Sequence, residues 1–119
     1  MRRALLFAFV VACIASPLAR AHAFLDRAAP AVGSTVRAPP TQIKLWFTQA
    51  LEPAFSTVRV VDRSNQRVDR GDAKVDSADA TILQASVPNL APGRYRVVWR
   101  VLSVDTHVTE GDFTFDVAP

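Results

Sequence analysis

The chain of 119 residues contains only two histidines, and histidine is the commonest metal ligand among side chains. His107 follows Asp105 by two residues, so in an extended strand both side chains would project from the same face. The pair could then offer a carboxylate oxygen and an imidazole nitrogen to one point. A histidine near an acid is also a common hydrogen-bonded surface pair, so this spacing alone is a weak indication of a metal site.

The other histidine, His22, follows a segment with the features of a secretory signal peptide. Two arginines precede an apolar run over residues 4–15, and Ala19-Arg20-Ala21 places small residues where a signal peptidase cuts. The run is shorter than the roughly 20 residues of a spanning helix, which disfavours the alternative of an uncleaved membrane anchor. We therefore expect residues 1–21 to be a cleaved signal peptide and residues 22–119 to be the exported domain.

Cleavage after Ala21 would make His22 the first residue, and a histidine in that position is a chelating group. Its free α-amine and its imidazole Nδ1 can close on one metal at little extra entropic cost. The pKa of an α-amine is about 8, so a metal displaces its proton readily at neutral pH. A new N-terminal histidine can also arise by chance, and chain termini are often disordered. The two histidines carry more weight together, because a single site accounts for both.

His22, Asp105 and His107 would supply three nitrogens and one oxygen to one ion. A tetragonal set of nitrogen and oxygen donors is the preference of copper(II), which also heads the affinity order of the divalent metals. Zinc could use the same donors more weakly, in tetrahedral geometry. These donors predict one copper(II) ion per chain.

Loss of the signal peptide would change the composition of the protein. Three of the 14 basic residues would leave, so that 11 face the 11 acids and the net charge falls from +3 to zero. This balance argues against nucleic acid as a partner. The single cysteine, Cys13, and the single methionine, Met1, would leave as well. Disulfides, thiolate zinc sites, iron–sulfur clusters and thioether copper(I) sites are therefore excluded from the exported domain.

Short strand patterns run through residues 22–119, with no helical period sustained over three turns. Alternating or β-branched apolar residues mark five segments, namely residues 42–47, 56–61, 81–87, 94–102 and 112–117. Residues 73–80 contain acids, but they lack the glycine and terminal glutamate of a calcium loop and predict a solvated connection. The pattern predicts one all-β domain, an antiparallel sandwich. Its core is expected to contain Trp46, Trp99, Phe113 and Phe115.

Beyond these patterns, residues 22–119 resemble the CopC family of copper-binding proteins over nearly their full length. The matching segments are His22-Ala23, Ala29-Pro30, Gly33-Ser34, Pro39-Pro40, Ile43 to Phe47, Phe55-Ser56, Leu90 to Arg100, Ser103 to His107 and Gly111 to Phe115. The W-R-x-x-S-x-D-x-H stretch that starts at Trp99, followed by G-x-F-x-F, is the most specific part of the resemblance.

The resemblance implies a seven-stranded Greek-key β-sandwich of the immunoglobulin-like type, located in the periplasm. It implies copper(II) held by the amine and side chain of His22 together with Asp105 and His107. Some relatives also hold copper(I) in a methionine-rich loop. Because no methionine remains after residue 21, the chain resembles the members that bind copper(II) only.

Gln49 departs from the family pattern. Phe47-Thr48-Gln49 stands where relatives often have Phe-Ser-Glu, and that glutamate is thought to support the N-terminal histidine. Gln49 can still accept a hydrogen bond through its amide oxygen, although without charge. Glu52 is the alternative support, and the sequence does not choose between the two. We expect the ligands to be intact and their orientation or affinity to be altered.

The predicted function is binding of one copper(II) ion, for sequestration or for delivery to an inner-membrane transporter in copper homeostasis and resistance. The resemblance implies a CopD-type partner. No acid–base pair, nucleophile–base set or phosphate loop is visible, so we expect no enzyme activity, and no membrane-embedded segment after cleavage. One alternative is a histidine-brace oxidative copper enzyme, which the Asp105 carboxylate disfavours because it stabilises static copper(II). The other is a metal-free immunoglobulin-like interaction module.

Overall fold

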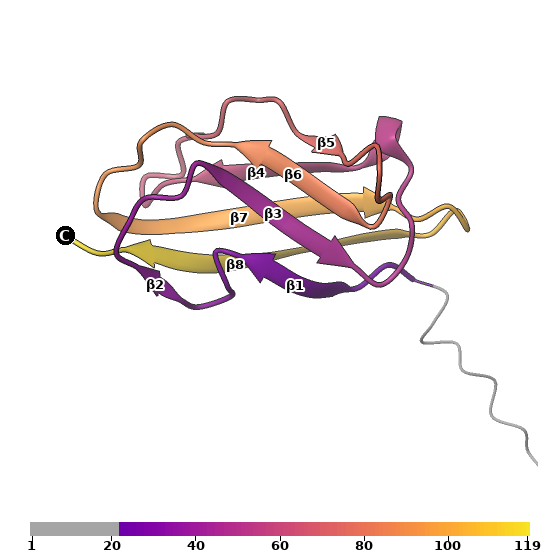
Figure 1. Cartoon of the computed structure of the whole chain (residues 1–119), viewed down its shortest axis with the longest axis horizontal. Coiled ribbons are helices and arrows are strands. Elements are labelled where there is room, and N and C mark those ends of the chain that lie inside the picture. Colours follow the sequence, from indigo (N-terminus) through magenta and orange to yellow (C-terminus); the bar gives the residue numbers. More distant parts are fainter. Residues whose placement is uncertain (1–21) are drawn as a thin grey trace, which may run out of the picture.

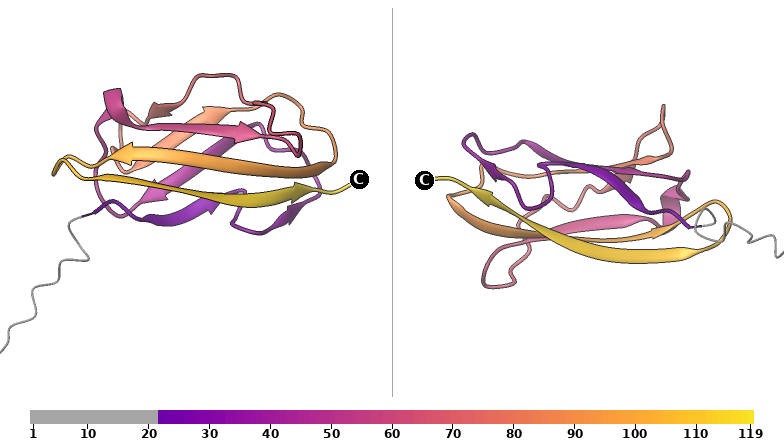
Figure 2. Two further views of the ribbon diagram at one scale, coloured as in Figure 1. Left: turned by 180° about the vertical axis from the view of Figure 1, so that it is seen from behind. Right: turned by 90° about the horizontal axis from the view of Figure 1, so that it is seen from below.

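Two four-stranded sheets pack face to face in this computed structural model, which describes residues 22–119 (Figures 1 and 2). The predicted signal peptide, residues 1–21, lies outside the described part. The strands are β1 (Leu25–Ala29), β2 (Thr35–Val36), β3 (Gln42–Phe47), β4 (Thr57–Val61), β5 (Lys74–Val75), β6 (Ile82–Ser86), β7 (Gly93–Leu102) and β8 (Val108–Val117). A single 3-10 turn, η2 (Pro53–Phe55), interrupts them within these residues. The all-β prediction is confirmed.

The strand order is β1-β3-β6-β5 in one sheet and β2-β8-β7-β4 in the other. All neighbours are antiparallel except β2 and β8. The five segments with a strand pattern correspond to β3, β4, β6, β7 and β8. The three further strands, β1, β2 and β5, were not expected from the sequence pattern, and β2 and β5 have only two residues each. The described part has eight strands, whereas the resemblance implied seven.

The core lies between the sheets and follows from the alternation in the long strands. In β7 every second residue from Tyr95 to Val101 is buried, and in β8 the buried residues include Phe113 and Phe115, as predicted. Trp99 packs edge-on against Phe47, with ring centroids 5.1 Å apart. Its ring also covers Gly111 so closely that a Cβ there would lie 2.6 Å from Cζ2 of Trp99. Glycine at that position therefore lets the indole pack against β8.

Trp46 does not belong to the core, contrary to the sequence expectation. It alternates with Leu45 and Phe47 in β3, which are buried, so its own side chain lies half-buried on the outer face of the sheet. The guanidinium of Arg27 lies 3.9 Å from the ring centroid and the ammonium of Lys44 lies 5.1 Å from it. This tryptophan is therefore a platform for two cations.

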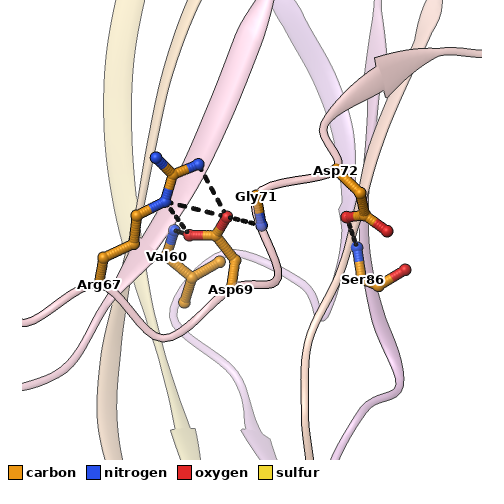
Figure 3. Close-up of polar contacts among 6 residues, drawn as sticks. All are labelled: Val60, Arg67, Asp69, Gly71, Asp72 and Ser86. Carbon is orange, nitrogen blue, oxygen red and sulfur yellow. Dashed lines mark hydrogen bonds and ion pairs between the residues drawn. The ribbon is translucent and has the colours of Figure 1, made fainter.

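The connection from β4 to β5 passes from one sheet to the other and is held by Asp69 (Figure 3). The Asp69 carboxylate has no exposed surface; it accepts hydrogen bonds from the amides of Val60 and Gly71 and a bidentate pair from Arg67. Burial alone would raise the pKa of Asp69, but the hydrogen bonds outweigh it and hold the pKa below its ordinary value. Farther along, the Asp72 carboxylate accepts a 2.8 Å bond from the amide of Ser86. These contacts fix the connection on both sheets.

Residues 73–80 form a connection with no buried residue, as predicted, although two of them pair as β5. The carboxylates of Asp76 and Asp79 accept hydrogen bonds from backbone amides two or three residues ahead. These acids therefore shape the turns themselves.

The β7–β8 hairpin ends at the same end of the sandwich where the described chain begins (Figure 1). Both strands have ten residues and pair without interruption from Gly93–Val117 to Leu102–Val108. The topology thus brings residues near 22 and near 105 to one end of the molecule. Among the described residues, no helix has the length and hydrophobicity that crossing a membrane requires.

Candidate metal centre

Asp105 and His107 lie in the turn that joins β7 to β8, not in an extended strand as the spacing suggested. The turn closes because the amide of Ser103 donates to the carbonyl of His107 at 3.0 Å and the amide of Thr106 donates to the carbonyl of Ser103 at 2.9 Å. Thr106 has a left-handed φ of 72°, which reverses the chain between the two candidate ligands. They meet through this reversal: Nδ1 of His107 lies 3.3 Å from Oδ1 of Asp105.

Ser103 fixes the orientation of the Asp105 carboxylate. Its side chain is completely buried at the base of the turn, and its hydroxyl donates a short hydrogen bond to Oδ1 of Asp105. That bond, with a smaller contribution from His107, holds the pKa of Asp105 below its ordinary value. The carboxylate is therefore ionised and oriented at neutral pH, as a metal ligand must be.

The segment that carries His22 is docked on the sandwich by its neighbours. Ala23 has no exposed surface and belongs to the core cluster. Its carbonyl accepts a 2.6 Å hydrogen bond from the hydroxyl of Thr109 in β8. The hydroxyl of Thr48 accepts a 3.0 Å bond from the amide of Phe24, and the amide of Thr48 donates to the carbonyl of Phe24 at 2.9 Å. His22 is therefore held in place by ordered backbone.

This docking brings His22 to His107. Their ring centroids are 4.5 Å apart with the ring planes nearly perpendicular, at 80°. The structure thus gathers the three sequence-predicted ligands at one end of the sandwich. Within residues 22–119 no three His, Cys, Asp or Glu side chains already converge as a metal cage. The His107 and Asp105 side chains are 48% and 40% exposed, so they are open to an ion from solvent and to rotation.

The two candidate supporting residues lie in the stretch between β3 and η2. Gln49 and Glu52 are both half-buried, and Gln49 directly follows Thr48, which holds Phe24. The amide of Glu52 donates a 2.8 Å hydrogen bond to the carbonyl of Leu102, which ties this stretch to the end of β7. Which of the two supports His22 stays a prediction.

Sequence reasoning did not identify three residues that position the ligands, namely Ser103, Thr48 and Thr109. Ser103 was visible only as part of the S-x-D-x-H stretch. Thr109 offered a weak signal, because it lies two residues after His107 on the inward face of β8. Their roles depend on contacts across the fold, which spacing along the chain does not display.

Comparison with known proteins assigns the chain to a family. The family model for the CopC domain matches residues 25–118, which is nearly all of the described chain. The chain belongs to the CopC domain family. This CopC-family protein is 35% identical over 113 residues to protein YobA of Escherichia coli strain K12, covering 92% of this chain and 90% of YobA.

Other relatives of this CopC-family protein carry copper in their names. It is 32% identical over 116 residues to copper resistance protein C of Pseudomonas syringae pv. tomato, covering 92% of this chain and 90% of that protein. Copper transport protein CutJ of Bacillus subtilis strain 168 is 26% identical over 98 residues, which are 82% of this chain but 18% of CutJ. The crystal structure of CopC from Methylosinus trichosporium OB3b is 39% identical, with a TM-score of 0.77, over 82% of this chain and 95% of that one. The family thus supports a copper-binding role and confirms the resemblance.

Proposed function

We propose that this protein binds one copper(II) ion through His22, Asp105 and His107. The observation that carries the proposal is the approach of the two imidazoles to 4.5 Å, with the Asp105 carboxylate 3.3 Å from Nδ1 of His107. In the metal-bound protein the ion takes the place of the contact between Asp105 and His107. Rotation of these two exposed side chains would bring their donor atoms to the ion, while the hydrogen bonds from Ser103 to the carbonyl of His107 hold the turn that carries them.

The fourth donor is the α-amine that signal cleavage after Ala21 would create on His22. The amine and imidazole of one residue form a small chelate, so the second nitrogen binds at little entropic cost. Docking of Ala23 and Phe24 adds to this advantage, because it places the chelate next to His107 before the metal arrives. The resulting three nitrogens and one oxygen suit copper(II) better than zinc.

The site is proposed to hold copper(II) and not copper(I). Soft copper(I) favours sulfur ligands, and residues 22–119 contain neither cysteine nor methionine. The donors here are two imidazoles, an amine and a carboxylate, and the carboxylate stabilises the higher charge. This set of donors also favours a copper-binding protein over an oxidative enzyme, because an oxidative enzyme must alternate between copper(I) and copper(II) and these donors stabilise copper(II).

The protein is proposed to act in the periplasm, sequestering copper(II) or passing it to an inner-membrane partner of the CopD type. Two features support delivery. The candidate ligands lie at an exposed end of the sandwich, within reach of a partner. The related CutJ carries the matching region as 18% of a larger chain named as a copper transport protein.

A copper(II) titration of the processed protein, followed by electron paramagnetic resonance, tests the proposal. We expect one equivalent of copper with a tetragonal spectrum and hyperfine splitting from three nitrogens. Competition against a chromogenic copper(I) chelator should show no retained copper(I). Fewer than three nitrogens, or tight copper(I) binding, would contradict the ligand set.

A further inference from the structure

A charged groove occupies the outer face of the second sheet, the face that Figure 2 (left) turns toward the viewer. It encloses about 540 Å³ between β4, β7, β8 and the β4–β5 connection. That connection projects beyond the sheet in Figure 2 (right) and contributes Asn65 and Arg67 to one wall. None of the three candidate copper ligands lines the groove, so whatever it does is separate from the metal centre.

Three arginines and one acid surround an apolar side chain, Val98, in this groove, because Asp112 of β8 pairs with Val98 on the side opposite β4. Arg59 of β4 pairs directly with Val98 of β7. Val98 shares the outer face of β7 with Arg96 and Arg100, which precede and follow it by two residues. Arg59 is therefore the diagonal cross-strand neighbour of both, at a separation of roughly 7–8 Å between backbone positions. The long side chains can meet over Val98.

The positive charges in the groove are unequally balanced. Arg96 forms a 3.0 Å ion pair with Asp112, and Arg100 lies 3.6 Å from the exposed Glu110. Within residues 22–119, Arg59 has no acid at ion-pair distance and no hydrogen-bond partner for its guanidinium, although it lies between two other arginines. Like charges so placed repel one another. An anion seated over Val98 would remove that repulsion.

Arg67 adds a fourth guanidinium whose position is fixed. Its Nε and Nη2 donate to Asp69, whose carboxylate is fully buried, and this pair anchors the overhanging wall (Figure 3). The Arg67 side chain is half exposed and lines the groove. All four cations in the groove are arginines, and the planar guanidinium fork of arginine matches carboxylate and phosphate oxygens. The two lysines of residues 22–119, Lys44 and Lys74, lie in the other sheet.

We propose that this groove binds a ligand that carries oxyanions, either phosphate or carboxylate groups, with Arg59 as its principal contact and Arg96 and Arg100 on either side. Val98 forms an apolar floor under the ligand. The source of the oxyanion is a soluble molecule or the headgroup of an anionic lipid, which present the same chemistry to the arginines. Binding does not depend on copper.

The test is a titration of metal-free protein with inorganic pyrophosphate at low ionic strength, followed by nuclear magnetic resonance of the arginine side chains. We expect saturable shifts of the Arg59 Nε–H signal and of the Val98 amide. Arg59→Gln should weaken binding about tenfold or more, since hydrogen bonds between charged groups are the strong ones. Arg59→Lys should lose most of the affinity, because the charge remains and the fork is lost.

Arg37→Gln is the matched control, because it removes the same charge from an exposed position outside the groove. Equal weakening by Arg59→Gln and Arg37→Gln would overturn the proposal and would indicate general charge attraction. The absence of both saturable shifts and vesicle binding would also overturn it, because the groove would then bind neither ligand. His107→Ala should bind pyrophosphate normally, which separates this proposal from the copper site. Flotation with phosphatidylglycerol vesicles, with phosphatidylcholine vesicles as the control, distinguishes a lipid headgroup from a soluble ligand. Vesicle binding that Arg59→Gln abolishes identifies the lipid headgroup. Pyrophosphate binding without vesicle binding identifies a soluble ligand.

Discussion

The hydroxyl of Thr109 donates a 2.6 Å hydrogen bond to the carbonyl of Ala23, a residue 86 positions earlier in the chain. Ala23 is completely buried, so this bond fixes the backbone immediately after His22. Thr109 itself lies two residues after His107. One hydrogen bond therefore couples the two halves of the proposed ligand set, which lie at opposite ends of the sequence.

Thr109→Val tests this coupling, because valine keeps the shape of threonine and removes only the hydroxyl. We expect copper(II) affinity to fall about tenfold, since His22 would lose its fixed position and binding would have to order it. Isothermal competition against a copper(II) chelator measures the loss. Thr114→Val is the control, since its side chain lies on the outer face of the same strand. Equal affinity in both variants would mean that Thr109 plays no part in the site.

Ser103→Ala should raise the pKa of Asp105. The Ser103 hydroxyl is the main cause of the lowered pKa in the folded protein, so its removal returns the carboxyl toward its ordinary value. The ionised form then disappears at a higher pH as the solution is acidified. A carbon-detected titration of the Asp105 carboxyl in metal-free protein follows this shift, with Ser64→Ala as an exposed control. An unchanged titration would show that the hydrogen bond does not orient the carboxylate.

Asp69 should make the fold sensitive to acid. Its pKa is lowered in the folded state, so the stability it contributes is present above the ordinary carboxyl pKa and is lost as the pH falls through the folded value. Asp69→Asn should cost about 1–3 kcal/mol at neutral pH, because buried donors lose a charged partner. Denaturant unfolding between pH 7 and pH 3 measures both effects. In the variant the loss of stability toward low pH should be smaller than in the wild type, whereas the exposed control Asp26→Asn should follow the wild type.

His107→Ala should damage copper(II) binding more than Gln49→Ala does. The first substitution removes a proposed ligand, whereas the second removes a group proposed to orient one, and such supporting groups typically contribute about 10–100-fold in affinity. Competition titrations of both variants, with paramagnetic resonance spectra, make the comparison. His107→Ala should lose one nitrogen from the spectrum and Gln49→Ala should keep all three. The reverse order of effects would exchange the roles assigned to these residues.

The long strands could be predicted from the sequence because alternation along β3, β7 and β8 reflects burial between two sheets. The short edge strands could not. β1 is exposed at most positions and has a register shift between Leu25 and Arg27, so no alternation marks it. Trp46 was expected in the core because it is large and apolar. Its position in β3 alternates with the buried Leu45 and Phe47, so its ring lies on the outer face of the sheet.

The candidate ligands could be predicted from residue type, but the reason that they meet could not. Asp105 and His107 were expected on one face of a strand, whereas a left-handed Thr106 brings them together in a turn. The contact of Thr109 with Ala23 joins residues too far apart for any local pattern. Chain termini are often disordered, yet Ala23, which directly follows His22, is part of the core. The sequence motif therefore indicates which residues are candidate donors, whereas tertiary contacts determine where those residues lie.

The most direct test of the proposed site compares protein that begins at His22 with protein that carries one additional residue before it. The extension converts the α-amine of His22 into an amide nitrogen, which breaks the chelate and leaves Asp105, His107 and the docked Ala23 unchanged. Copper(II) affinity should fall by orders of magnitude and one nitrogen should disappear from the resonance spectrum, while circular dichroism and metal-free melting stay the same. The two forms should differ in melting temperature only when copper is present. Equal affinity and an equal number of coordinated nitrogens in both forms would contradict the N-terminal chelate.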